Sequence, residues 1–233
     1  ELYFENIPSE LTKTKVSVKE SGRYISCDPQ LAYYSTKLQT ERLETLRFAK
    51  ELRKDLNRPL AVCDPFCGVG PALSTLIAEE DLVERILASD LNAAAVELLF
   101  ENLQRWDKRE YPTESKPIEQ YYDDRIVGQA DATKLSGNSK YSGKWDLVLV
   151  NLPHRTIEFL PKIIPLLNRN NISLIRGRVI VAESDIKYAN EQINQILPPI
   201  ASGKPKPQLK IKRDYSSTLR LCSFEAWIDK EFN

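Results

Sequence analysis

The chain has 233 residues, and its 33 lysines and arginines balance its 33 aspartates and glutamates. This length is enough for one large α/β domain with a small appendage, but it excludes two domains of ordinary size. The balanced charge excludes a global field that would attract a polyanion, so any contact with nucleic acid must come from local basic patches.

The four cysteines lack the Cys-x-x-Cys spacing of a zinc site, which favours small buried thiols in a reducing compartment. No apolar run is long enough to cross a bilayer, and no secretory leader pattern opens the sequence. We therefore expect a cytoplasmic protein without a bound metal or a membrane contact.

The first part of the chain predicts a small β-rich appendage over residues 1–39. Residues 11–38 alternate polar and apolar side chains in short bursts that are separated by turn residues. A helix should follow, with Thr40 as its N-cap, an apolar stripe over residues 43–52, and an end at Asn57.

A strand, a glycine turn and a helix are predicted next, and the rest of the domain is organised around them. The apolar residues 60–63 lead into Asp64, a turn that contains Gly68 and Gly70, and a helix reaching about residue 80. Such a turn brings backbone N–H groups close to a ligand, although it also serves as a plain strand-to-helix corner.

Strands and helices then alternate along residues 40–233, which predicts an α/β domain with one doubly wound, mostly parallel Rossmann-like sheet. We expect the closing pair of strands to be antiparallel. The expected strands lie at 85–89, within 126–132, and at 145–150, 179–182, 208–212 and 219–228, with helices at 93–106, 158–167 and 185–197 and an exposed loop at 107–124.

Polar residues follow four of these strands at their carboxyl ends: Asp64, Asp90, Asp131 and Asn151. In an open α/β sheet these ends face one crevice. Asp90 suits the two hydroxyls of a ribose, and Asp131 suits an adenine amino group. Each acid alone is equally well explained as a helix N-cap, but their convergence favours a nucleoside pocket.

These motifs carry a family resemblance. Residues 64–71, 90–92 and 151–153 resemble class I S-adenosylmethionine-dependent methyltransferases. Residues 33–42 resemble the segment that precedes this domain in the archaeal and eukaryotic tRNA guanine-N1 methyltransferases, whose relative in the wybutosine pathway transfers an aminocarboxypropyl group. The resemblance extends over about residues 16–185.

The resemblance implies S-adenosylmethionine as cofactor and tRNA as partner, with methyl transfer to guanine N1 next to the anticodon. The sequence departs from the family pattern at two positions, where Ala93 replaces a proline and Cys67 replaces an alanine. The implied cofactor-binding residues are Asp64, Phe66, Gly68, Gly70, Asp90, Leu91, Asn92, Asp131, Ala132, Asn151 and Pro153.

The resemblance also implies three catalytic residues. Glu41 matches the acid that removes the N1 proton, Tyr33 matches an active-site aromatic residue, and Asn151 matches the residue that orients the base. The chemistry agrees, because the weakly acidic N1 proton needs a base within hydrogen-bond reach. Without the resemblance, Glu41 is better explained as a first-turn carboxylate that complements the helix dipole.

Substrate contacts are predicted for Lys37, Arg42 and His154, the last being the only histidine. A second basic segment favours phosphate contact and a plain solvated face about equally, and it consists of Lys204, Lys206, Lys210, Lys212 and Arg213.

Two other functions stay open: aminocarboxypropyl transfer, and a catalytically silent subunit with the same fold. The family's N-terminal tRNA-gripping domain has no counterpart in this sequence. We therefore expect a further domain or a partner subunit to hold the RNA.

Overall fold

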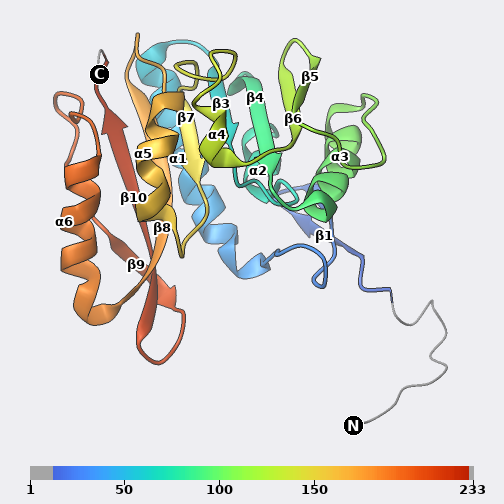
Figure 1. Ribbon diagram of the computed structural model, residues 1–233. Coiled ribbons are helices and arrows are strands. Elements are labelled where there is room, and N and C mark those ends of the chain that lie inside the picture. Colours follow the sequence, from blue (N-terminus) through green and yellow to red (C-terminus); the bar gives the residue numbers. More distant parts are fainter. Residues whose placement is uncertain (1–12, 231–233) are drawn as a thin grey trace.

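The computed structural model describes residues 13–230, and an eight-stranded sheet forms its centre (Figure 1). The strands of this sheet are Leu60–Asp64 (β3), Val83–Asp90 (β4), Glu119–Tyr122 (β5), Arg125–Gln129 (β6), Leu147–Val150 (β7), Ser173–Ala182 (β8), Lys210–Asp214 (β9) and Leu219–Ile228 (β10). Their order is β5-β6-β4-β3-β7-β8-β10-β9. Strands β6, β4, β3, β7 and β8 pair in parallel, whereas β5 and β10 run antiparallel to their neighbours. The predicted doubly wound, mostly parallel sheet is confirmed.

Helices cover both faces of this sheet, as a doubly wound fold requires. Side chains of the first three helices pack in one core layer, and those of the last three pack in the other. The helices are Gln39–Leu56 (α1), Pro71–Leu76 (α2), Ala93–Asp107 (α3), Ala132–Leu135 (α4), Thr156–Ile163 (α5) and Ile186–Ile196 (α6).

The predicted β-rich appendage is a two-stranded antiparallel hairpin of Val16–Glu20 (β1) and Arg23–Cys27 (β2). It lies against α3, where the Ser26 backbone exchanges hydrogen bonds of 2.7 and 2.9 Å with the buried Asn102 side chain. Ile25 shares a small apolar core with Leu98 of that helix. A domain boundary at residues 39 and 40 stays a prediction, and residues 1–12 lie outside the described part.

A buried ion pair joins the hairpin to α1. The Arg42 guanidinium donates to both carboxylate oxygens of Glu20, at 2.5 and 2.6 Å, and to the Ser35 carbonyl at 2.9 Å. Tyr34 donates its hydroxyl to the same carboxylate at 2.8 Å. Both charged side chains are only 3% exposed, so each depends on the other for its partner.

Several predicted element bounds were wrong. Helix α1 begins at Gln39, so Thr40 lies inside it and does not cap it, although the helix does end before Asn57, whose φ is 52°. Helix α2 ends at Leu76, short of residue 80. The predicted loop over 107–124 contains β5, and its Tyr111 is buried against the Phe100 ring.

Strand β8 begins at Ser173, six residues before the predicted start at 179. Apolar periodicity missed the first half because Arg176 and Arg178 interrupt it. Both arginines are buried, and carboxylate or amide oxygens from other elements accept their hydrogen bonds. Charged residues thus occupy a central strand because tertiary partners compensate for their desolvation.

The hairpin contact can be tested with Glu20→Gln. The substitution leaves the buried Arg42 charge without a counterion, so urea unfolding should show a loss of about 3–5 kcal/mol. Lys15→Gln is the control, because it breaks an exposed pair with Glu101 and should cost less than about 1 kcal/mol. Equal losses in the two variants would contradict the role given to the buried pair.

Candidate active site

The glycine turn after β3 is held by the carboxylate at the end of β4. One oxygen of Asp90 accepts from the Gly68 N–H at 2.8 Å, and the other accepts from the Asn92 N–H at 2.9 Å. Gly68 has a φ of +54°, a conformation that side-chain-bearing residues seldom adopt. Asp90 therefore fixes the ends of two neighbouring strands and keeps lone pairs for a ligand.

A cavity of about 570 Å³ opens at these strand ends. It collects most of the predicted site residues from separate parts of the chain, as the convergence of strand ends predicts. Those lining it are Tyr33, Arg42, Phe66, Gly68, Asp90, Leu91, Asn92, Asp131, Ala132 and Asn151.

Two residues of the predicted cofactor set lie behind the cavity wall. Asp64 is 1% exposed, and burial, reinforced by the Asp90 charge, raises its pKa from 3.8 to about 7. Gly70 has a φ of +85°, and a Cβ there would lie 2.7 Å from Leu99 Cδ1 on α3. Both residues therefore stabilise the conformation of the glycine turn and do not line the cavity.

Two predicted cofactor-binding residues also cap helices, and for Asp131 the N-cap alternative is confirmed. The Asn92 side chain accepts from the Ala94 N–H at 3.0 Å and caps α3. The Asp131 carboxylate caps α4 by accepting from the Thr133 N–H and hydroxyl, and these bonds lower its pKa. Both caps also line the cavity, so capping orients polar side chains toward it.

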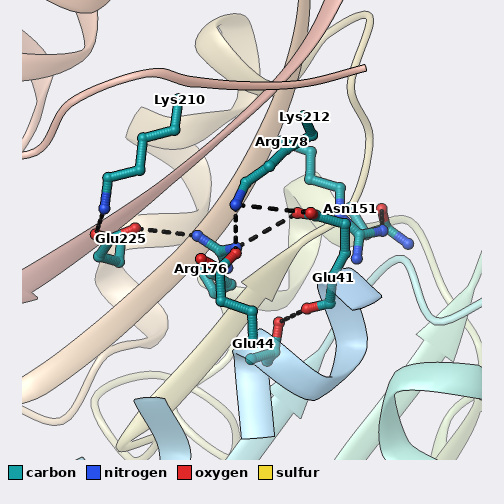
Figure 2. Close-up of polar contacts among 9 residues, drawn as sticks. Glu41, Glu44, Asn151, Arg176, Arg178, Lys210, Lys212 and Glu225 are labelled. Carbon is teal, nitrogen blue, oxygen red and sulfur yellow. Dashed lines mark hydrogen bonds and ion pairs between the residues drawn. The ribbon is translucent and has the colours of Figure 1, made fainter. Parts of the chain in front are cut away.

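Glu41 lies in a buried cluster of charges between α1 and the sheet (Figure 2). Its carboxylate is 3.4 Å from the Arg176 guanidinium and 3.6 Å from Lys212 Nζ. Arg176 and Lys212 also contact Glu44, one turn further along α1, and Arg176 reaches Glu225 on β10 at 3.0 Å. Acids from two elements thus converge on Arg176 of β8.

Asn151 meets a second buried arginine. Arg178 Nη1 donates to Asn151 Oδ1 at 2.8 Å. Burial lowers the pKa of Arg178 to about 10, and the nearby Glu41 charge acts in the opposite direction. Sequence reasoning missed Arg176 and Arg178. The signal that could have found them is their spacing of two, which places both on one face of a strand.

The predicted substrate-binding residues differ in exposure, because Lys37 is exposed whereas Arg42 is buried in its pair with Glu20. Tyr33, which was predicted as catalytic, is 73% exposed at the cavity. His154 is exposed, and its ring lies 3.2 Å from the Tyr215 hydroxyl. The remaining predicted cofactor residue, Pro153, accepts from the Ile180 N–H at 2.9 Å and so joins its turn to β8.

The second basic segment is largely neutralised by acids. Lys204 lies 2.8 Å from both Glu51 and Asp55, and 3.7 Å from the centre of the Trp227 ring. Lys210 pairs with Glu225, and Lys212 pairs with Glu41 and Glu44. Lys204 and Lys212 thus pair with acids of α1, and Lys210 joins β9 to β10, which argues against a free phosphate-binding patch.

Within residues 13–230 no three His, Cys, Asp or Glu side chains gather in a way that could hold a metal ion. In the same range no helix combines the length and the apolar character that a membrane crossing requires.

The sheet order and the cavity at its carboxyl ends define a Rossmann-like methyltransferase fold. The chain belongs to a particular family of this class, because residues 16–175 match the model of the TRM5/TYW2 methyltransferase domain.

Named relatives agree with this assignment. Trm5b of Pyrococcus abyssi, a tRNA (guanine(37)-N(1))-methyltransferase, is 28% identical over 159 residues, which are 68% of this chain and 39% of the relative. A Paramecium tetraurelia enzyme of the same name is 36% identical over 86 residues, covering 37% and 20%. The chain therefore spans well under half the length of these relatives.

Two solved structures from Methanocaldococcus jannaschii share the fold. The tRNA m1G37 methyltransferase superimposes with a TM-score of 0.68 at 20% identity, covering 94% of this chain and 58% of that one. TYW2 in complex with AdoMet superimposes with a TM-score of 0.66 at 19% identity, covering 99% and 90%.

The buried Asp64 carboxyl predicts an unusual pH dependence. Its pKa is 3.8 ordinarily and about 7 in the fold, so the native state retains a proton that the unfolded chain has lost. Stability from this group should therefore fall as pH rises from about 4 to 7. Asp64→Asn should remove this fall in urea unfolding.

Asp131→Asn is the matched control. The pKa of Asp131 is lowered in the fold, so the wild type should lose its advantage over this variant as pH falls toward the lowered pKa. A stability difference between wild type and Asp64→Asn that does not change with pH would contradict the prediction.

Proposed function

We propose that this chain is the catalytic domain of a tRNA guanine-N1 methyltransferase, which transfers a methyl group from S-adenosylmethionine to the guanine next to the anticodon. The observation that carries the proposal is that two predicted catalytic residues contact neighbouring buried arginines of β8. Arg178 donates to Asn151 in the cavity wall, and Arg176, two residues before it, pairs with Glu41 at 3.4 Å.

The cavity has the donors and acceptors that the cofactor needs. Asp90 keeps acceptor capacity for the ribose hydroxyls, and Asp131 offers a carboxylate to the adenine amino group. Gly68 leaves backbone room, while Leu91 and Ala132 supply apolar surface for the base. When bound, the cofactor would supply an activated methyl group on its sulfonium.

The chain's own residues would position the guanine and remove its proton. Asn151 would hold the base edge, and exposed Tyr33 would stack on an extruded purine at the mouth of the cavity. Glu41 would accept the N1 proton when N1 receives the methyl group that the bound cofactor would supply. Arg176 and Lys212 provide the partners that a buried carboxylate requires.

Partner and location follow from the same proposal. The substrate is tRNA, with Lys37 and His154 as exposed candidates for contacts, and a further domain or a partner subunit grips the RNA body. Arg42 contributes through its bond to Glu20 rather than through phosphate. The cysteines are free and buried, which supports a cytoplasmic location.

Aminocarboxypropyl transfer is a second candidate. The observation that favours it is the family match, because the matched domain is shared by TRM5 and TYW2 proteins. The two reactions share a cofactor and differ in which carbon on the sulfonium faces the base.

Incubation with unmodified tRNA and two forms of labelled S-adenosylmethionine should separate these functions. We expect label from the methyl carbon to appear as 1-methylguanine, and none from the aminobutyrate carbon. The reverse pattern would establish aminocarboxypropyl transfer. If calorimetry shows that the cofactor binds but no label is transferred, the enzyme proposal is contradicted. If the cofactor does not bind, the catalytically silent subunit is favoured.

The role of Glu41 can be tested against its neighbour Glu44. Glu41→Gln should lower kcat by about 10²–10⁴-fold, the usual contribution of a general base. Glu44→Gln removes a carboxylate that contacts the same two cations, so it should disturb the cluster similarly while it retains the base. Similar losses of kcat in both variants would assign Glu41 a structural role only.

A further inference from the structure

We propose that Arg178 is a positioning residue that locks the Asn151 side-chain amide with its N–H end toward the cavity. The site would thereby accept a purine that carries an oxygen at C6. This inference rests on the proposed function and deepens it, because it names the contact that separates guanine from adenine.

The chemistry of the two side chains fixes the orientation. A guanidinium has five N–H donors and no acceptor, so only the oxygen end of an amide can face it. Arg178 Nη1 lies 2.8 Å from Asn151 Oδ1, which leaves Asn151 Nδ2 at the other end of the amide. No group in the described part of the chain is assigned a hydrogen bond from Nδ2, and Asn151 lines the cavity.

Backbone contacts hold the two residues in register. The Thr156 hydroxyl lies 2.6 Å from the Arg178 carbonyl and 2.9 Å from the Leu152 carbonyl, and thus joins β8 to the turn that carries Asn151. Two residues further along β8, the Ile180 N–H donates to the Pro153 carbonyl at 2.9 Å. The turn is therefore attached to β8 at Arg178 itself and again two residues beyond it.

Arg178 differs from its neighbour Arg176 in a way that needs an explanation. Arg176 pairs with carboxylates on α1 and β10, so its burial is explained by structural ion pairs. Arg178 is just as buried, at 8% exposure, yet no carboxylate in residues 13–230 lies within ion-pair distance of it. Among the described residues, its side chain makes a single hydrogen bond, to Asn151. A buried charge that serves a single amide oxygen is expensive as a purely structural device.

The Asn151 amide in this fixed orientation distinguishes purines by the group that they carry at C6. Guanine has an acceptor, O6, beside N1, whereas adenine has the N6 amino donor at that position. An N–H group of Asn151 that faces O6 completes a hydrogen bond, but facing N6 it meets another donor. Without Arg178 the amide could rotate and present its oxygen to an amino group, and the distinction would weaken.

A double-mutant cycle tests this role. We would measure methyl transfer by wild type, Arg178→Met, Asn151→Ala and the double variant, on tRNA carrying guanosine, inosine or adenosine at the modified position. Arg178→Met should lower kcat/KM for guanosine and inosine by about tenfold or more, and should reduce the preference for these 6-oxopurines over adenosine. In the Asn151→Ala background the same change should have no further effect.

Two controls separate positioning from structural damage. Arg178→Lys retains a donor-only side chain and should restore part of the selectivity. Calorimetric affinity for S-adenosylmethionine should stay unchanged in Arg178→Met. An equal loss of kcat/KM in the presence and absence of Asn151, or unchanged selectivity, would overturn the inference while the enzyme proposal stands. A wild type that methylates no tRNA would overturn both.

Discussion

A buried arginine surrounded by acids is the interaction on which the site depends. Arg176 of β8 pairs with Glu41 and Glu44 of α1 and with Glu225 of β10. Each of these charges would be costly to bury alone, so the cluster forms only when the helix and both strands are in place. The Arg176 guanidinium also lies 5.3 Å from the centre of the Phe48 ring, which joins the cluster to the apolar core.

Consecutive residues of α1 extend this constraint to the rest of the fold. Glu41 faces the sheet, whereas Arg42 pairs with Glu20 of the hairpin. The helix is therefore held from two sides at the turn nearest the cavity. Asp90 provides a similar connection at the carboxyl ends of β3 and β4, where it joins the glycine turn to the start of α3. Polar contacts across elements, more than any single loop, shape the walls of the cavity.

The sequence predicted those features that depend on local pattern. Alternating strands and helices gave the sheet, and the polar residues at strand ends identified Asp90, Asp131 and Asn151 as neighbours in one cavity. Prediction failed where long-range pairing overrides local preference. The arginines of β8 look unsuitable for a buried strand until their partners on α1, on β10 and at Asn151 are known.

The burial of Arg42 and Gly70 could not be predicted either, because their neighbours Glu20 and Leu99 are distant in the sequence.

The position of β10 has a consequence for how the protein folds. This strand follows every other strand in sequence, yet it lies inside the sheet, between β8 and β9. During synthesis, the core of the sheet can form before residues 219–228 emerge, but Arg176 then lacks Glu225 and β8 has an open edge. Such late, non-local pairing slows folding, and until it forms, the unpaired edge of β8 can aggregate with other chains. Completion of the charge cluster therefore requires the C-terminal strand to insert beside β8.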